Sequence, residues 1–189
     1  MPRPTRQQID DEILETAAAL FARHGFKETS VQRIADAVGY SKTGLLHRYP
    51  SKEALQAAVI ESCVGELRAI AAGVDDLPPG PDRDRAALTG VAQLAMRRPG
   101  TVALVLSGML GEPDGEITAA LHTIGCATFE AFALDPEADH ARMLRVTGAL
   151  GALAVARVAL RDKLPADAML AHLIEISYDA LGHPRPATH

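Results

Sequence analysis

Four side chains of different chemistry lie close together between residues 42 and 47. They are a cation, a hydroxyl, an apolar group and an imidazole, carried by Lys42, Thr43, Leu46 and His47. In a helix, positions i, i+1, i+4 and i+5 share one face, and Leu45 then points to the opposite side. Such a set of groups can bond to base edges and contact thymine methyl groups in a major groove. The spacing therefore predicts a helix that reads DNA sequence.

The flanking residues are suited to phosphate groups. Thr29 is placed to cap a short helix, with Gln32 completing a capping box, and the start of a helix attracts anions. Lys52 combines a cation with the start of another helix. Arg3 and Arg6 form a short basic arm, which suits phosphates or a minor groove, although a solvated terminus explains them equally well. Contacts with the DNA backbone are therefore expected on both sides of residues 42–47.

The elements that position these residues are expected to be helices. Apolar residues recur with helical spacing along the chain, and the alternation typical of strands is missing. Gly39 separates two short helices, the first capped by Thr29 and the second running from Ser41 to about Tyr49, because glycine suits a tight turn. The other expected helices span 6–24, 52–73, 83–97, 100–110, 114–134, 137–163 and 165–181. The predicted fold class is all-α, with about nine helices and a helix-turn-helix near the N-terminus.

Charge is distributed unevenly along the chain. The 189 residues carry a formal net charge of −5, which excludes a uniformly basic nucleic-acid-binding protein of the histone type. Residues 1–60 hold 8 basic and 7 acidic side chains, whereas residues 61–189 hold 11 and 17. We expect a DNA-binding domain over 1–50 and a second domain over 51–189, connected by the long helix that begins at residue 51. The acidic surplus of the second domain is expected to keep DNA away from it.

Several classes of protein and site are not expected. The longest charge-free stretches have 13 residues, fewer than the ~18–20 apolar residues of a membrane span. The beginning of the chain has no apolar core of a signal peptide, so we expect a cytoplasmic protein without a membrane partner. Cys63 and Cys126 match no zinc or redox motif. No catalytic residue, metal or cofactor is expected, because no nucleophile–base arrangement or phosphate-binding glycine loop is present, and the chain is not expected to be an enzyme.

The residues from Ile13 to Leu55 resemble a known domain. They read ILETAAALFARHGFKETSVQRIADAVGYSKTGLLHRYPSKEAL and are similar to the DNA-binding domain of the TetR family of transcriptional regulators. The similarity includes Gly25, Gly39 and Tyr49 at fixed spacing. It implies a helix-turn-helix domain that binds double-stranded DNA, most often as a repressor. The rest of the chain matches the family only in the number and lengths of its helices.

One position departs from the family pattern. The family usually has a tyrosine where this chain has Leu46, and leucine cannot donate to a phosphate. Either His47 or Arg48 supplies that contact, or Leu46 contacts a thymine methyl or packs inward. Tyr40 is larger than the usual residue, and its hydroxyl is expected to reach the DNA backbone. The residues expected to contact DNA are Thr29, Ser30, Tyr40, Ser41, Lys42, Thr43, Leu46, His47, Arg48, Lys52, Arg3 and Arg6.

The resemblance also implies a homodimer that packs through its last two helices and binds a pseudo-palindromic operator. Residues 143–160 are apolar on nearly every side, and a helix of this kind is buried. In a domain this small, the most natural place to bury it is against a second subunit. The residues expected at the dimer interface are Leu150, Leu153, Leu160, Leu173, Ile174, Ser177 and Tyr178.

A small, largely apolar ligand is expected to bind inside the second domain. It would change the spacing of the two DNA-binding domains by binding one arrangement more tightly than the other. The residues expected to line its pocket are Met96, Met109, His122, Cys126, Phe129 and Phe132. Packing in the core is the alternative for the two phenylalanines.

Three functions remain open. The chain is a homodimeric repressor released from its operator by a ligand, or a regulator without a small-molecule inducer, or a helical small-molecule-binding protein with degenerate DNA binding. The cation, hydroxyl and imidazole of residues 42–47 favour the first two.

Overall fold

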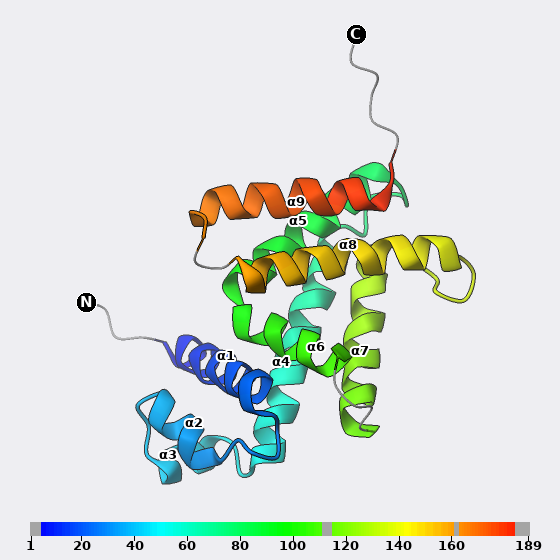
Figure 1. Cartoon of the computed structure of the whole chain (residues 1–189). Helices are drawn as coiled ribbons and strands as arrows, with labels where there is room; N and C mark the ends of the chain where they lie inside the picture. Colours follow the sequence, from blue (N-terminus) through cyan, green and yellow to red (C-terminus); the bar gives the residue numbers. More distant parts are fainter. Residues whose placement is uncertain (1–4, 111–114, 161–162, 184–189) are drawn as a thin grey trace. The chain divides into compact units, whose positions relative to one another are not determined.

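The computed structural model describes residues 5–110, 115–160 and 163–183, with only the backbone at 115–118. This part of the chain forms nine α-helices and no strand, which confirms the all-α prediction (Figure 1). None of its helices is long and apolar enough to cross a membrane. The helices are α1 (Arg6–His24), α2 (Val31–Ala37), α3 (Lys42–Arg48), α4 (Lys52–Gly73), α5 (Pro81–Arg97), α6 (Pro99–Leu110), α7 (Gly115–Ala131), α8 (His140–Ala159) and α9 (Ala166–Leu181).

Local sequence signals explain where most helices begin. Proline occupies the first position of α5 and of α6, where its missing N–H is not needed. Helix α8 begins three residues later than predicted because the Asp139 side chain caps it, accepting from the Arg142 backbone N–H at 2.9 Å. Helices α1 and α4 have the predicted bounds.

The chain divides into two compact units. Unit 1 consists of Met1–Cys63 and Arg98–Leu121, and unit 2 consists of Val64–Arg97 and His122–His189. Helices α4 and α7 therefore each contribute residues to both units. Unit 1 contains the whole predicted DNA-binding region and, in addition, α6.

The core of unit 1 is formed by the inner faces of its first four helices. Buried residues recur at helical spacing on α1, with Ile13, Ala17 and Phe21 pointing inward. They pack against Ile34 of α2 and Leu45 of α3, both fully buried, and against the first turns of α4. This packing fixes which side of α3 remains outside.

Helix α6 belongs to unit 1 because α1 binds its first turn. The Glu15 carboxylate accepts hydrogen bonds from the Gly100 and Thr101 backbone N–H groups, the latter at 3.3 Å, and from the Thr101 hydroxyl at 3.1 Å. Arg98 donates to the Asp11 carboxylate at 2.6 Å. A carboxylate at a helix N-terminus satisfies amides that have no partner within the helix.

The core of unit 2 lies among α5, α8 and α9. Leu88 of α5, Leu153 of α8 and Leu173 of α9 are all buried in it. The buried Asp84 carboxylate of this core is paired, because it accepts two hydrogen bonds from Arg142, at 2.8 and 3.0 Å. These two hydrogen bonds join the first turns of α5 and α8.

Candidate nucleic-acid interface

Helices α2 and α3 form a helix-turn-helix with a serine cap at each start. The Ser30 hydroxyl accepts from the Arg33 backbone N–H at 3.1 Å, and the Ser41 hydroxyl accepts from the Gly44 backbone N–H at 3.0 Å. Gly39 in the turn has a φ of +72°, a conformation that glycine adopts without strain. The turn closes through a 2.9 Å bond from the Tyr40 N–H to the Ala35 carbonyl.

The prediction that Thr29 caps α2 is wrong by one residue. Ser30 is the cap, whereas Thr29 is only 1% exposed and its hydroxyl donates to the carbonyls of Gly25, at 2.8 Å, and Leu20, at 3.2 Å. The Thr29 hydroxyl therefore holds the end of α1 against the start of α2, and it is not available to a phosphate. The predicted capping box with Gln32 is absent for the same reason, and Gln32 donates to Asp36 at 2.6 Å.

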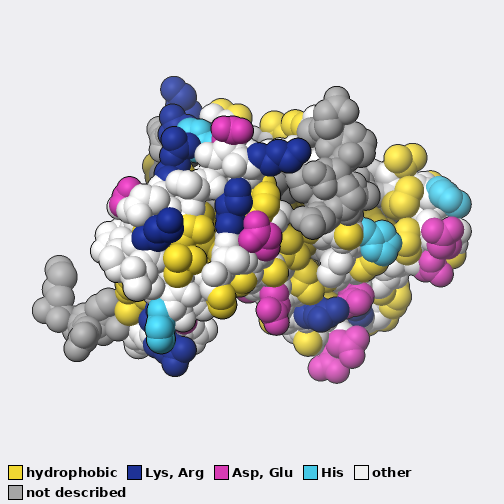
Figure 2. All heavy atoms as spheres, turned by 90° about the horizontal axis from the view of Figure 1, so that it is seen from below, with side chains coloured by type: hydrophobic (Ala, Val, Ile, Leu, Met, Phe, Trp, Pro, Cys, Tyr) yellow, Lys and Arg dark blue, Asp and Glu magenta, His cyan; other side chains and the backbone are white. Residues whose placement is uncertain are grey.

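The two sides of α3 differ as predicted. Leu45 is fully buried against α1 and α2, which turns Lys42, Thr43 and His47 to the exposed side. Leu46 is half-buried at the edge of this face. Seen from below, cationic and histidine side chains stand at the surface of the α2–α3 part (Figure 2). The exposed face offers donors, an acceptor and an apolar group to a ligand in contact with α3.

Lys52 does not point away from the protein. Its ammonium donates to the carbonyl oxygens of Phe26, at 2.8 Å, and Lys27, at 3.2 Å, and lies 4.4 Å from the centre of the Phe26 ring. These contacts hold the start of α4 against the loop between α1 and α2. The phosphate contact predicted for Lys52 would therefore require the ammonium to leave these two carbonyl oxygens.

Arg48 is likewise engaged within unit 1. It forms an ion pair with Asp10 of α1, and the Tyr49 hydroxyl lies 3.4 Å from the same carboxylate. Burial, and then the charge of Asp10, raise the pKa of Tyr49 from 10.0 to about 12. Of the two residues expected to replace the family's tyrosine contact, Arg48 is thus paired with Asp10, whereas His47 is exposed.

The remaining predicted DNA contacts lie at several places on unit 1. Ser30, Ser41 and Arg6 are exposed, and Tyr40 is half-buried beside the turn. Arg3 lies outside the described residues. Sequence reasoning missed one exposed cation, Arg33 on α2, although its position directly before the buried Ile34 is a signal that it faces outward.

The residues predicted to line a ligand pocket are not brought together. Phe132 is fully buried in the core of unit 2, whereas Met109 on α6, and His122 and Cys126 on α7, are exposed. Met96 and Phe129 are half-buried. The His122 ring and the Cys126 thiol are neighbours one turn apart, with the sulfur 3.8 Å from Nδ1.

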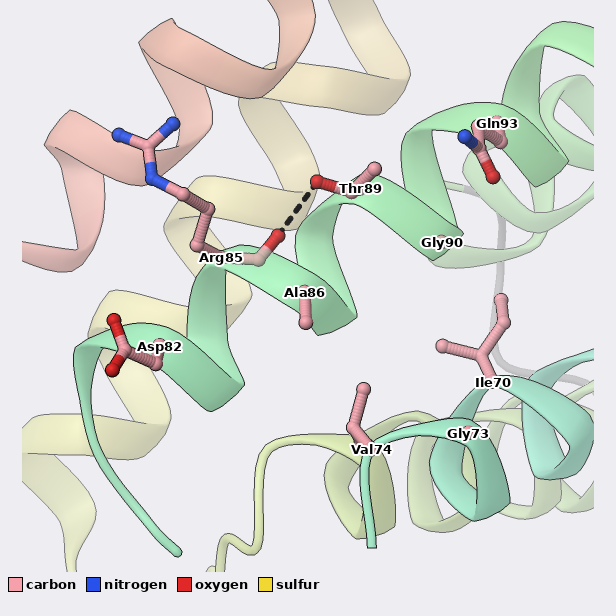
Figure 3. A pocket seen from close by; sticks show the side chains of 9 residues that line it. All are labelled: Ile70, Gly73, Val74, Asp82, Arg85, Ala86, Thr89, Gly90 and Gln93. Atoms are coloured by element: carbon pink, nitrogen blue, oxygen red, sulfur yellow. Dashed lines mark hydrogen bonds between the residues drawn. The ribbon is translucent and has the colours of Figure 1, made fainter. Parts of the chain in front are cut away.

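Unit 2 has an open groove elsewhere, between the end of α4 and α5. It has a volume of about 500 Å³ and an apolar floor formed by Ile70, Val74 and Ala86, while Asp82 and Gln93 lie at its ends (Figure 3). Helices α4 and α5 can approach closely beside it because Gly90 has no side chain: a Cβ there would lie 2.8 Å from Ile70 Cγ2. None of the predicted pocket residues lines this groove.

The predicted dimer residues divide into two groups. Leu153, Leu173 and Ser177 are buried between the helices of unit 2, so they cannot form an exposed interface, and this part of the prediction is corrected. Leu150, Ile174 and Tyr178 are half-buried, and Leu160 is exposed. Other large apolar residues of the same two helices are exposed: Leu144 and Val155 on α8 are 68% and 54% exposed, and Ile176 on α9 is 56% exposed.

Comparison with known proteins agrees with the geometry of α2 and α3. Residues 13–59 match the family model described as bacterial regulatory proteins, tetR family. The HTH-type transcriptional regulator RutR of Escherichia coli K12 is 48% identical over 48 residues, which are 25% of this chain and 23% of RutR. The HTH-type transcriptional repressor KstR2 of Rhodococcus jostii RHA1 is 35% identical over 69 residues, 34% of each chain. The chain thus matches about a quarter to a third of the length of these relatives.

Solved structures match over nearly the whole chain, but at low sequence identity. The TetR-family transcriptional regulator PfmR from Thermus thermophilus has a TM-score of 0.62 and 17% identity, covering 98% of this chain and 100% of PfmR. AibR, solved in complex with isovaleryl coenzyme A and operator DNA, has a TM-score of 0.58 and 21% identity, covering 89% of this chain and 97% of AibR. At these identities the likeness shows the fold.

The family match spans most of α1, the helix-turn-helix and the first turns of α4, which are the elements that share the core of unit 1. RutR, KstR2 and PfmR are transcriptional regulators and not enzymes. Residues 13–59 of this chain therefore match the TetR family of bacterial regulatory proteins, as the sequence resemblance predicted.

Proposed function

We propose that this chain is a DNA-binding transcriptional regulator that acts as a homodimeric repressor. The observation that supports this most is the orientation of α3. Its apolar side is locked into the core by Leu45, so that Lys42, Thr43 and His47 stand outward together. A helix presented in this way by a preceding helix and a tight turn is the element that reads base edges in the major groove.

The exposed groups of α3 have distinct tasks in this proposal. His47 and Thr43 bond to base edges, and Leu46 contacts a thymine methyl group at the edge of the same face. Lys42 neutralises a phosphate, because its ammonium is exposed at the start of α3. Arg33 on α2 and Arg6 on α1 add backbone contacts, which position the domain without reading sequence.

A homodimer is supported by an apolar strip on α8. Four residues share one face of this helix because they are spaced by four, three and four positions: Leu144, Gly148, Gly151 and Val155. A Cβ at Gly148 or Gly151 would meet no atom within 4 Å, so packing within the chain does not require glycine there. Glycine between two exposed apolar residues fits a second helix that approaches closely. Exposed Ile176 on α9 extends the apolar surface that a second copy would cover.

A two-fold symmetric dimer recognises a pseudo-palindromic operator. Each half-site receives one α3, and the half-sites lie roughly one helical turn of DNA, about 34–36 Å, or a multiple of it apart. A small, largely apolar ligand bound by unit 2 would release the protein from DNA by favouring a different spacing of the two α3 helices. The AibR complex, which holds both isovaleryl coenzyme A and operator DNA, is a precedent within this fold.

The experiment that tests this function is selection of binding sites from a random pool of double-stranded DNA. We expect the selected sequences to share two inverted half-sites, and the purified chain to bind them as a dimer. Selection of a single unrepeated motif would contradict the dimer, and no enrichment even at low salt would favour a helical small-molecule-binding protein with degenerate DNA binding. A dimer that binds its operator but is released by no compound would favour regulation without a small-molecule inducer.

A further inference from the structure

The groove between the end of α4 and α5 has the size of a site for a small molecule. Its volume of about 500 Å³ lies within the ~300–1,000 Å³ range of ligand pockets. Ile70 of α4, Val74 directly after α4, and Ala86 of α5 direct their side chains into it (Figure 3). All of its lining residues belong to unit 2, so the groove is formed within one compact part of the chain.

Gly73 leaves the α4 side of the groove open. It is the last residue of α4, it is exposed, and a Cβ placed on it would meet no atom within 4 Å. Gly90 on the α5 side is different, because a Cβ there would lie 2.8 Å from Ile70 Cγ2. Packing within the chain therefore requires glycine at position 90 but not at position 73, where a larger side chain would take up space in the groove.

Asp82 is a charged lining residue without a partner among the residues that the structure describes. It is exposed at the end of the groove near the start of α5 (Figure 3). Arg85 also lines the groove, but its guanidinium pairs with Glu175 of α9 at 2.8 Å and lies 4.1 Å from the centre of the Tyr178 ring. Buried Arg83 donates to three backbone carbonyls and does not line the groove. Both neighbouring cations are therefore engaged elsewhere.

The two ends of the groove differ in charge. At the end marked by Asp82, two further carboxylates are close in sequence to the floor, because exposed Asp75 and Asp76 directly follow Val74. At the other end, eleven residues and about 16 Å further along α5, Gln93 is polar and neutral. The groove thus combines an apolar floor with one anionic end and one neutral polar end.

We propose that this groove binds the ligand of unit 2 and that the ligand is an organic cation with an apolar body. Its ammonium or amidinium group bonds to the Asp82 carboxylate, and the nearby Asp75 and Asp76 add to the attraction. Its apolar body covers Ile70, Val74 and Ala86. This inference rests on the proposed ligand response and makes it more specific, because it names the site and the sign of the ligand's charge.

The test uses three probes that share an octyl chain and differ in their end group. They are octylamine, which is protonated at neutral pH, octanol and octanoate. Isothermal titration calorimetry, at concentrations below micelle formation, gives the dissociation constant and the number of sites. We expect the wild type to bind one octylammonium per chain, more tightly than octanol, with octanoate weakest. The preference for octylammonium over octanol should disappear at about 1 M salt, where the Debye length is roughly 3 Å.

Two pairs of variants locate the site. Asp82→Asn removes the charge, and Asp167→Asn is its control, because Asp167 is likewise the exposed second residue of a helix in unit 2. Asp82→Asn should weaken octylammonium binding about threefold to fivefold, as for an ion pair at an exposed site, and leave octanol binding unchanged. Gly73→Leu should weaken binding of both probes. Its control Gly65→Leu should not, since Gly65 lies on α4 outside the groove and a Cβ there also meets no atom within 4 Å.

Several results would overturn the proposal. They are equal binding of the three probes, tightest binding of octanoate, no binding of octylammonium, or wild-type affinity for octylammonium in Asp82→Asn or Gly73→Leu. All four substituted residues are exposed, so the variants should fold, and the comparison of probes and salt concentrations needs the wild type alone.

Failure of the groove is distinguishable from failure of the proposed function, because probe binding is measured without DNA. Asp82→Asn and Gly73→Leu should bind the selected operator without ligand as tightly as the wild type does. A chain that binds octylammonium in the groove but binds no operator would contradict the regulator and support the groove. A chain that binds its operator but shows no preference for the cation would contradict the groove and leave the regulator intact.

Discussion

Replacing Lys52 with methionine should destabilise the protein and leave the salt dependence of DNA binding unchanged. Replacing Lys42 with methionine should leave the stability unchanged and reduce the salt dependence of DNA binding. Both lysines are the first residue of a helix and follow a serine cap. Their surroundings differ, however. The Lys52 ammonium is bonded to two carbonyls and lies over a phenylalanine ring, while the Lys42 side chain is exposed.

The magnitudes follow from these contacts. Hydrogen bonds to a charged group contribute roughly 1.5–3 kcal/mol each and a cation–π contact about 0.5–1 kcal/mol. Lys52 is half-buried, so hydrogen bonds to water offset part of these contributions in the unfolded chain. We therefore expect Lys52→Met to lower the free energy of unfolding by about 1–3 kcal/mol. Each phosphate contact contributes about 0.9 to the slope of log K against log salt. Lys42→Met should therefore reduce the slope by about 0.9 per protomer.

Two assays on the same pair of variants measure these quantities. Urea unfolding followed by circular dichroism gives the stability, and fluorescence anisotropy with the selected operator over a range of salt concentrations gives the slope. If Lys52→Met lowered the slope by about one and kept the wild-type stability, its ammonium would leave the Phe26 loop for a phosphate, and the reasoning would be refuted.

Three further predictions concern the packing of unit 1 and its titration. Gly100→Ala should destabilise the protein by about 1–3 kcal/mol in urea unfolding, because the new Cβ would lie 2.6 Å from a backbone oxygen of α1. The control Gly65→Ala places a Cβ with no atom within 4 Å and should raise the free energy of unfolding by about 0.5–1 kcal/mol. Equal effects of the two substitutions would contradict this packing. Thr29→Val should lower the free energy of unfolding by about 1–2 kcal/mol without changing the slope of log K for DNA binding against log salt. A lower slope would show that Thr29 contacts a phosphate after all. Tyr49 should ionise near pH 12 by ultraviolet absorbance, so its contribution to stability is present below about pH 10 and is lost as the pH rises to 12. Asp10→Asn should lower this pKa only in part, because burial is its first cause, and a return to 10.0 would contradict that order.

The sequence predicts the helices well because their signals are local. Apolar spacing that ends at Gly25 predicted α1, and the Ser51 cap predicted the start of α4, both at their observed bounds. Glycine and proline marked the ends of other helices. The error at Thr29 shows the limit of such signals. Two adjacent hydroxyl residues can each cap a helix, and only the packing of α1 against α2 decides that Thr29 turns inward and Ser30 caps.

Side-chain partners that are distant in sequence could not be predicted. Lys52 bonds to a loop 25 and 26 residues earlier, and Arg48 pairs with a residue 38 positions earlier. Both arginine and lysine are equally suited to phosphates, so their types alone do not distinguish the two roles. The interface residues on α8 posed a related problem: a helix that is apolar all round does not indicate which face the chain itself covers, and here it covers Leu153 and leaves Leu144 exposed.

The most direct test of the central claim is operator binding by the double variant Thr43→Ala, His47→Ala. Both side chains are exposed, so the variant should unfold at the wild-type urea concentration. We expect it to lose sequence preference, with its affinity for the selected operator falling to that for unrelated DNA. His140→Ala, a histidine exposed at the start of α8, serves as the control and should bind as the wild type does. Unchanged affinity and sequence preference in the double variant would contradict the assignment of α3 as the recognition helix.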